Sequence, residues 1–255
     1  MRAIILAAGR GLRLQQADDR QLPKCLLQFG GMTLLERHLR ILRNAGVDDI
    51  VLALGYRHER VEAEIERLRW QPRPEIVLNP RFELGSVLTV HTAADAMSRG
   101  GDVLLMDADV LYDERIAAPL IAGRASVNRV LIDRDFEAGD EPVKLCVSGG
   151  VPIELRKQLP AGLSYDTIGE SVGFFRFDST AARRLATLVA GYVERDCAQM
   201  PHEEAVRDLL RERSQIFEVV DVTGAPWIEI DFPTDVVRAA HEVLPQLQPL
   251  SGAAP

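Results

Sequence analysis

The chain has 255 residues, with 30 Lys and Arg against 38 Asp and Glu, which gives a formal net charge of −8. At about 100–200 residues per domain, this length fits one large domain or two small ones. The acidic balance argues against a general nucleic-acid binder, because no surplus of basic side chains remains to neutralise phosphates. No apolar run approaches the ~20 residues of a membrane span. Three well-separated cysteines without CxxC spacing indicate reduced thiols, so we expect a cytoplasmic protein that binds neither nucleic acid nor membrane.

Residues 1–125 alternate between short apolar runs and amphipathic segments. We expect strands at residues 3–6, 50–54, 75–78 and 103–106, and helices at residues 33–45, 58–70 and 86–97. Thr33 and Glu36 have capping-box spacing at the start of the first helix, and Gly46 follows its end. Strands separated by helices predict right-handed βαβ units. The predicted fold class is therefore α/β: a Rossmann-like, mostly parallel twisted sheet with helices on both faces.

After residue 125 the pattern changes. Strand-like runs at 127–133, 143–147 and 171–177 have no helices between them and predict a small antiparallel extension beside the main sheet. Helices are expected at 181–194, 202–212 and 233–244, and strands at 216–222 and 227–230. No linker divides the chain, so we expect a single domain over residues 1–244. Residues 245–255 contain three prolines and little to bury, and are expected to be disordered.

The most informative loop follows the first expected strand and reads LAAGRGLRL at residues 6–14, with Pro23 and Lys24 downstream. Gly9 and Gly11 allow the backbone to approach a ligand and to turn its N–H groups toward phosphate oxygens. The loop carries a local charge of +2, from Arg10, Arg13, Arg20 and Lys24 against Asp18 and Asp19. A dinucleotide-binding loop needs a glycine or alanine where Leu14 stands, and a P-loop needs GK[ST]. The loop therefore favours an anionic, phosphate-bearing ligand, with a solvated surface turn as the alternative.

Two pairs of carboxylates stand two residues apart on apolar strands. Asp107 and Asp109 end the strand in LLMDADVLYD, and Glu229 and Asp231 occur in WIEIDFPTD. Residues i and i+2 point to the same side of a strand, so each pair can face one point. Mg²⁺ takes one or two carboxylates together with substrate phosphates. The alternatives are a turn in which Asp forms local hydrogen bonds and, for Asp231, helix capping.

The segments LAAGRGLRL and LPKCLLQFGGMTLLERHLRIL resemble the nucleoside-triphosphate transferase family, which joins nucleoside triphosphates to sugar phosphates or phospho-alcohols. The resemblance extends over nearly the whole chain, up to about residue 244. It implies that the glycine loop holds the triphosphate and that Arg13 and Lys24 neutralise its phosphates. It also implies that the backbone of Leu6, Ala7 and Ala8 reads the base of the nucleotide.

The same resemblance implies roles for the carboxylates and a reaction. Asp109 aligns with the metal-binding Asp of the family, and an acidic residue of the WIEID segment completes the site, so Glu229 and Asp231 are both candidate ligands. With Mg²⁺ as cofactor, and Arg13 and Lys24 beside Asp109, an acceptor phosphate oxygen attacks the α-phosphorus and pyrophosphate leaves. No nucleophilic Ser or Cys is required. We interpret Cys25 as a small buried residue rather than a reactive thiol.

Four further segments resemble the cytidylyltransferase branch that acts on choline phosphate, inositol phosphate or aminoalkyl phosphonates: NPRFELGSV, IGESVGFF, PHEEAVRDLL and VTGAPWIEID. They imply CTP as the nucleotide, with Gly85 and Ser86 in contact with the base. Helix N-capping by Ser86 is the alternative, and both can hold together. We also predict that Asp107 is one of the nucleotide-binding residues.

Lys144 matches a segment of the inositol-phosphate and sugar-phosphate relatives in which a lysine contacts the acceptor phosphate. Glu170, Glu203 and Glu204 are candidates to bind an ammonium group or hydroxyls of the acceptor. A solvated strand lysine is the alternative for Lys144, and an acid that complements a helix dipole is the alternative for Glu203. Pro201 and His202 stand where choline-type relatives tend to have aromatic residues, which disfavours choline phosphate.

We therefore expect a Mg-dependent nucleotidyltransferase that couples CTP to a phosphorylated small alcohol, polyol or phosphonate. It releases pyrophosphate and forms a CDP- or CMP-linked product. The alternatives are a sugar-1-phosphate nucleotidylyltransferase using UTP, dTTP or GTP, and a non-catalytic nucleotide-sensing module. The WIEID segment disfavours a molybdopterin-type transferase. The sequence leaves the oligomeric state open.

Overall fold

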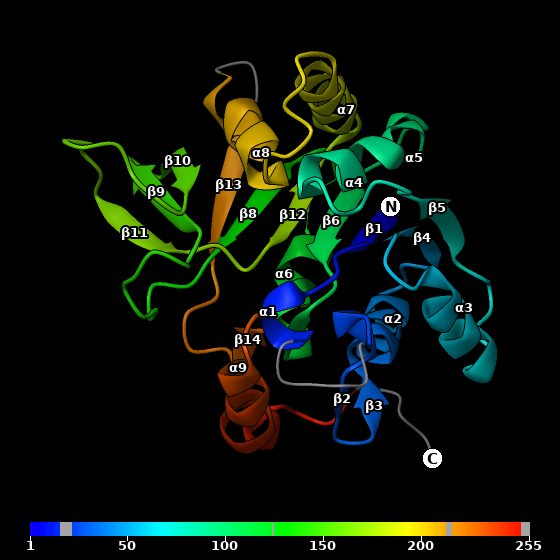
Figure 1. Ribbon diagram of the computed structural model, residues 1–255. Coiled ribbons are helices and arrows are strands. Elements are labelled where there is room, and N and C mark those ends of the chain that lie inside the picture. The colour runs from blue at the N-terminus through cyan, green and yellow to red at the C-terminus, as the bar shows by residue number, and fades with distance from the viewer. Residues whose placement is uncertain (16–21, 124, 213–215, 251–255) are drawn as a thin grey trace.

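A seven-stranded sheet forms the centre of the computed structural model, which describes residues 1–15, 22–123, 125–212 and 216–250 (Figure 1). Its strand order is β13-β8-β12-β6-β1-β4-β5. Neighbouring strands run parallel, except that β12 is antiparallel to both β6 and β8. This arrangement confirms the predicted Rossmann-like, mostly parallel sheet. The strands are β1 (Arg2–Ala7), β4 (Asp49–Leu54), β5 (Glu75–Leu78), β6 (Val103–Asp107), β8 (Asn128–Ile132), β12 (Phe174–Phe177) and β13 (Phe217–Asp221).

Helices cover both faces of this sheet, as predicted (Figure 1). Apolar side chains of β1 alternate between two cores: Ile5 packs into the first and Ile4 into the second. Because both faces are buried, β1 is an almost unbroken apolar run. The first core is closed by α2 (Leu34–Asn44), α3 (His58–Arg67) and α6 (Glu114–Ile121). The second is closed by α4 (Ser86–Thr92), α5 (Ala94–Ser98), α7 (Ser179–Glu194) and α8 (His202–Arg211).

One predicted helix begins at its expected cap, whereas another is divided into two helices. The Thr33 side chain accepts a hydrogen bond from the Glu36 N–H at 3.0 Å, which confirms the predicted start of α2. The single helix expected over residues 86–97 is wrong, because the chain breaks at Ala93 between α4 and α5. The Thr92 hydroxyl donates to the Thr89 carbonyl at 2.7 Å, an alternative partner that competes with a continuous helical ladder.

An antiparallel extension lies beside the main sheet (Figure 1). It consists of β9 (Lys144–Ser148), β10 (Val151–Arg156) and β11 (Thr167–Glu170), in the order β10-β9-β11. The expectation that residues 127–133 and 171–177 belong to it is wrong. They contain β8 and β12, whose residues are all buried, and burial on both faces is possible for them only inside the main sheet.

A third, smaller core joins the segments that follow β1 and β6 to the C-terminal part of the chain. It forms where β7 (Val110–Tyr112) pairs antiparallel with β14 (Trp227–Glu229). The helix expected at 233–244 is α9 (Pro233–Arg238), which continues through a π-helical turn at Ala239–Val243 and a 3-10 turn at Leu244–Gln246. The remaining elements here are α1 (Leu12–Gln15), a 3-10 turn (Lys24–Leu26), β2 (Gln28–Phe29) and β3 (Met32–Thr33).

The chain beyond residue 244 packs against the rest of the protein up to residue 250, and Leu250 joins the first core. The Gln248 N–H donates to Asp113 Oδ2 at 2.8 Å, and the Leu250 side chain is buried. The expected disorder is therefore wrong for residues 245–250, while residues 251–255 lie outside the described part of the chain. Among the described residues, no helix combines the length and the apolar character needed to cross a bilayer.

Candidate nucleotide and metal site

The glycine loop leaves β1 where the strand order reverses, with β4 on one side of β1 and β6 on the other. Open α/β sheets bind ligands at such a switch point, outside the carboxyl ends of the strands. Gly11 has a φ of +64°, and a Cβ placed on it would lie 3.0 Å from Cγ and 3.1 Å from Cε of Lys24. Gly9 has no atom within 4 Å of the same position. Glycine at position 11 is thus required by conformation and by the close approach of Lys24, whereas position 9 borders open space.

A cavity of about 520 Å³ opens beside this loop. Three cationic side chains reach it, and two of them, Arg13 and Lys24, are predicted site residues. It is lined by Arg10, Gly11, Leu12, Arg13, Lys24, Phe82, Glu83 and Asp231. A smaller cavity of about 70 Å³ continues toward the strand ends and is lined by Leu6, Ala7, Gly9, Gly11, Lys24, Cys25, Ala108 and Asp109. Asp18, Asp19 and Arg20, counted in the local charge of this loop, lie outside the described residues.

The backbone predicted to read a base is partly engaged with protein. The Ala108 N–H donates to the Leu6 carbonyl at 3.3 Å, and the Tyr56 N–H donates to the Ala8 carbonyl at 3.0 Å. Each carbonyl keeps a second lone pair for a ligand. The thiol of Cys25 is buried, and burial raises its pKa to about 12, in agreement with its interpretation as a packing residue.

Three carboxylates converge where β7 and β14 pair. The Ile230 N–H donates to the Asp109 carbonyl at 2.9 Å and ties the two segments together. Oxygen atoms of Asp109, Glu229 and Asp231 lie within 4.8 Å of one another. Both candidates of the WIEID segment, Glu229 and Asp231, therefore lie beside Asp109. Carboxylate oxygens are hard ligands of the kind that Mg²⁺ takes.

Asp107 does not join this cluster, contrary to the expectation that Asp107 and Asp109 face one point. Among the described residues, the cluster has only the three members above. Asp107 ends β6, and its Oδ1 lies 3.9 Å from His202 Nε2 on α8. The alternation of side chains holds within a strand, but β6 ends at Asp107, so Asp109 is no longer subject to it.

Lys24 is the cation at the centre of the carboxylate cluster. Its Nζ lies 2.8 Å from Asp109 Oδ2 and 2.5 Å from Asp231 Oδ1. Burial by itself lowers the pKa of Lys24, but the two carboxylates outweigh it and raise the pKa above its usual value. Burial opposes ionisation of Asp231 too, yet Lys24 holds the pKa of this carboxyl below its usual value. The pair is therefore charged over the whole physiological range of pH.

The other two carboxyls of the region have raised pKa values. Burial, and then the charges of Asp109 and Glu203, raise the pKa of Asp107 well above its usual value. Glu229 has an exposed side chain, yet the protein packed around its carboxyl and the charge of Asp109 raise its pKa as well. Burial and neighbouring negative charges thus disfavour the ionised forms of Asp107 and Glu229, and a cation bound nearby would favour them.

Arg13 stands at the outer rim of the cavity. Its guanidinium lies 2.9 Å from Glu141 Oε2 and 3.5 Å from Asp231 Oδ2, and it is 5.0 Å from the centre of the Phe232 ring. About half of the Arg13 side chain is exposed (51%), so these contacts leave it accessible to an anion in the cavity.

Gly85 and Ser86 start α4 and pack directly against the segment before α8. A Cβ on Gly85 would lie 2.5 Å from the backbone carbon of Gln199. Ser86 Oγ accepts from the His202 N–H at 2.8 Å and lies 3.1 Å from His202 Nδ1. Gly85 and Ser86 therefore join α4 to the segment before α8. The alternative that Ser86 caps α4 is wrong, because Gly85 is the N-cap residue and no side chain caps this helix. The predicted contact of both residues with the base stays a prediction.

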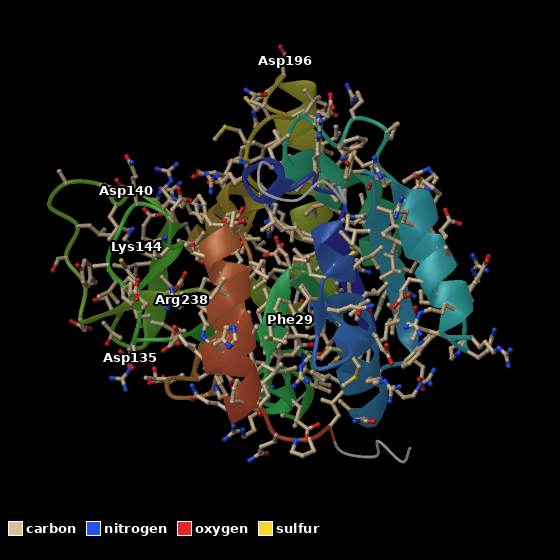
Figure 2. All side chains as sticks on the ribbon, turned by 60° about the horizontal axis from the view of Figure 1, so that its bottom comes forward. Phe29, Asp135, Asp140, Lys144, Asp196 and Arg238 are labelled. Atoms are coloured by element: carbon tan, nitrogen blue, oxygen red, sulfur yellow. The ribbon has the colours of Figure 1, made fainter. Side chains whose placement is uncertain are left out.

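The predicted acceptor residues lie in different parts of the structure. The Lys144 ammonium donates to the carbonyls of Gly139 and Lys157 at 2.6 Å each, so the expected contact with an acceptor phosphate is not supported. Figure 2 shows Lys144 on the extension, to the left of α9 with Arg238. Glu170 ends β11, and burial followed by the Asp133 charge raises its pKa to about 7.

Glu203 lies in a different position, at the amino end of α8. Its Oε2 is buried and accepts no hydrogen bond from the described residues. It borders a cavity of about 330 Å³ between the extension and α8, lined by Val143, Leu155, Arg156, Lys157, Gln158, Pro201, Glu203 and Glu204. Lys157, one of three lysines in the chain, was not among the predicted site residues; it lines this cavity, and its Nζ lies 3.1 Å from Glu141 Oε2.

The chain is similar to a described protein family and to named proteins. Residues 3–167 match the family described as MobA-like NTP transferase domain. The bifunctional IPC transferase and DIPP synthase of Rubrobacter xylanophilus is 29% identical over 95% of this chain. The chain spans 52% of that relative, about half its length. The CTP:phosphoglutamine cytidylyltransferase of Campylobacter jejuni is 24% identical over 92% of this chain and 98% of its own length.

The fold of this chain is also found in a solved structure. The inositol-1-phosphate CTP transferase from T. maritima superimposes with a TM-score of 0.76 at 20% identity, over 100% of this chain and 98% of the other. At this identity the likeness establishes the fold alone.

Proposed function

The chain belongs to the MobA-like NTP transferase domain family, and on that premise we propose that it is a magnesium-dependent cytidylyltransferase. Its substrates are CTP and a small phosphorylated or phosphonate acceptor, and its products are pyrophosphate and a CDP- or CMP-linked compound. The observation that carries the proposal is the meeting of Asp109, Glu229 and Asp231 with Lys24 and Arg13 beside one cavity at the switch point of the sheet.

The preference for CTP is supported by the names of the relatives. The Campylobacter jejuni protein is named for CTP, and so is the T. maritima transferase that shares this fold. The cavity beside the glycine loop, about 520 Å³ in volume, has three cationic side chains on its wall, which suits a triphosphate.

The proposed reaction requires positioning rather than covalent catalysis by the protein. An acceptor phosphate oxygen forms a bond to the α-phosphorus of CTP, the bond from that phosphorus to the bridging oxygen breaks, and pyrophosphate leaves with the electron pair. The attacking oxygen is already anionic, so no general base is needed. Arg13 and Lys24 bind the phosphates and hold the two anions together in line.

The carboxylate cluster fits a divalent cation by two observations. Its donors are hard carboxylate oxygens, and the Lys24 ammonium is a stand-in cation on two of them. Asp109, Glu229 and Asp231 would hold the ion, and a bound Mg²⁺ would supply positive charge beside the phosphates.

The acceptor pocket is assigned to the cavity between the extension and α8. The Oε2 of Glu203 lies 3.2 Å from His202 Nδ1 but accepts no hydrogen bond from the described residues. This supports an acceptor that brings a hydroxyl or an ammonium group, because a buried carboxylate without a hydrogen-bond donor is costly. A phosphorylated polyol or an aminoalkyl phosphonate meets this condition. Lys157 supplies a cation on the same wall.

The test is pyrophosphate release from CTP, UTP, dTTP and GTP with choline phosphate, 2-aminoethylphosphonate, inositol-1-phosphate and hexose-1-phosphates in turn. We expect turnover with CTP and Mg²⁺, and none after chelation of the metal. Turnover with UTP or dTTP alone would contradict the assignment of CTP and favour a sugar-1-phosphate nucleotidylyltransferase. Nucleotide binding without turnover for any pair would favour a nucleotide-sensing module.

A further inference from the structure

The position of the Lys24 ammonium has a consequence beyond phosphate binding. Nζ lies 2.8 Å from Asp109 and 2.5 Å from Asp231, two of the three carboxylates in the cluster. The three side chains are only 16%, 21% and 25% exposed, so water replaces these contacts poorly. We propose that Lys24 is a built-in counter-ion that competes with a divalent cation for Asp109 and Asp231. The site then takes the divalent cation tightly only when an anion in the adjacent cavity draws Lys24 away.

Competition follows from charge and from the geometry of the oxygens. An ammonium in contact with two carboxylates already compensates the charge that would attract a second cation, and two cations within a few ångströms of each other repel. The arrangement also explains why three carboxylates can be held this close in one fold. Without Lys24, Asp109 and Asp231 would be like charges in a poorly solvated place.

The adjacent cavity has room for the Lys24 ammonium. Its stem passes Gly11, where the missing side chain leaves room, and it lines the cavity of about 520 Å³ together with Arg10 and Arg13. A lysine has a flexible four-carbon stem, so its ammonium can move from the carboxylates to an anion in the cavity without a change of backbone. Arg13 also contacts Asp231, so the same anion attracts both cations that hold this carboxylate. Only the identity of the anion, a triphosphate, rests on the proposed function.

The experiment measures Mn²⁺ binding to the protein without nucleotide, by the electron paramagnetic resonance signal of free Mn²⁺. We compare the wild type with Lys24→Met, which removes the ammonium, and Lys24→Gln, which keeps a hydrogen-bond donor. Arg99→Met is the matched control, because Arg99 is an exposed partner of Glu75 that precedes β6, at the opposite end of that strand from Asp109. We expect about tenfold tighter Mn²⁺ binding in both Lys24 variants and no change in the control.

A second measurement guards against misfolding. Circular dichroism establishes that each variant is folded, and Mn²⁺ is expected to raise the melting temperature of the Lys24 variants more than that of the wild type. The proposal is wrong if both folded variants bind Mn²⁺ no more tightly than the wild type. It is also wrong if the wild type alone, without nucleotide, already binds Mn²⁺ with micromolar affinity. The assay involves no turnover, so a protein inactive on every nucleotide would refute the proposed function and leave this result unaffected.

Discussion

The two glycines of the loop after β1 look equivalent in the sequence, and the structure predicts opposite effects when each is replaced by alanine. At Gly11 an alanine must adopt φ near +64°, which costs a non-glycine residue about 1–2 kcal/mol. Its Cβ would also lie 3.0 Å from Lys24 Cγ, so the lysine must shift by a few tenths of an ångström. We therefore expect Gly11→Ala to lower the free energy of unfolding by about 1–2 kcal/mol.

At Gly9 no atom lies within 4 Å of the added Cβ, and φ is outside the left-handed region. Alanine there restricts the unfolded chain without straining the folded one, so the free energy of unfolding is expected to stay equal or rise by up to about 1 kcal/mol. Urea denaturation followed by circular dichroism measures both values, with the linear extrapolation to water. The reasoning fails if Gly11→Ala is as stable as the wild type, or if Gly9→Ala loses as much stability as Gly11→Ala.

The two alanine variants are also expected to differ in their enzyme kinetics. In Gly11→Ala the displaced Lys24 is expected to lower kcat/KM for CTP by about tenfold or more, since small misplacements of a positioning group are costly. In Gly9→Ala the Cβ enters the open space beside the loop, so we expect the KM for CTP to rise in a protein that remains fully stable. An unchanged KM for CTP in Gly9→Ala would show that the triphosphate does not pass this residue.

Three further predictions concern single carboxylates and one buried ion pair. Asp109→Asn is expected to lower pyrophosphate release by about 10²-fold or more while cooperative unfolding by urea is retained, and unchanged turnover would remove Asp109 from the site. Arg176→Met is expected to cost about 3–5 kcal/mol in unfolding free energy, because Asp102, now 2.6 Å from the guanidinium, would lose its main partner; a loss under about 1 kcal/mol would contradict this. The raised pKa of Glu170, about 7 against a usual 4.5, means that the folded protein binds this proton more tightly than the unfolded chain does. The wild type should therefore lose stability relative to Glu170→Gln as the pH rises from 4.5 to 7, with no further divergence above that, and parallel pH profiles of the two proteins would refute it.

Local patterns determined a large part of the fold. The apolar run of β1 and the spacing of Thr33 and Glu36 are properties of a few consecutive residues, so the strand and the helix start could be predicted from them. The assignment of residues 127–133 and 171–177 to the extension failed for the opposite reason. Which sheet a strand joins depends on long-range pairing, and β8 and β12 pair with β6 and β13 across large separations in the sequence.

The same distinction between local pattern and long-range packing applies to the carboxylates of the candidate site. The composition of LLMDADVLYD and WIEIDFPTD already indicates a cation site, because four acids on apolar strands need compensation. That Asp109 meets both Glu229 and Asp231 is decided by the pairing of β7 with β14, and that Asp107 turns toward His202 is decided by the packing of α8.

Residue types alone predict the kind of chemistry: cations on a glycine loop after the first strand, and acids after two other strands, in a chain with a net charge of −8. Which group each of these side chains contacts depends on the folded arrangement. The Lys144 ammonium donates to carbonyl oxygens, Glu203 Oε2 lies beside His202 without accepting a hydrogen bond, and Lys24 contacts the carboxylates. The physical reason is that residue type sets which groups can interact, while the contact that forms depends on distances of a few ångströms between segments that only the folded chain brings together.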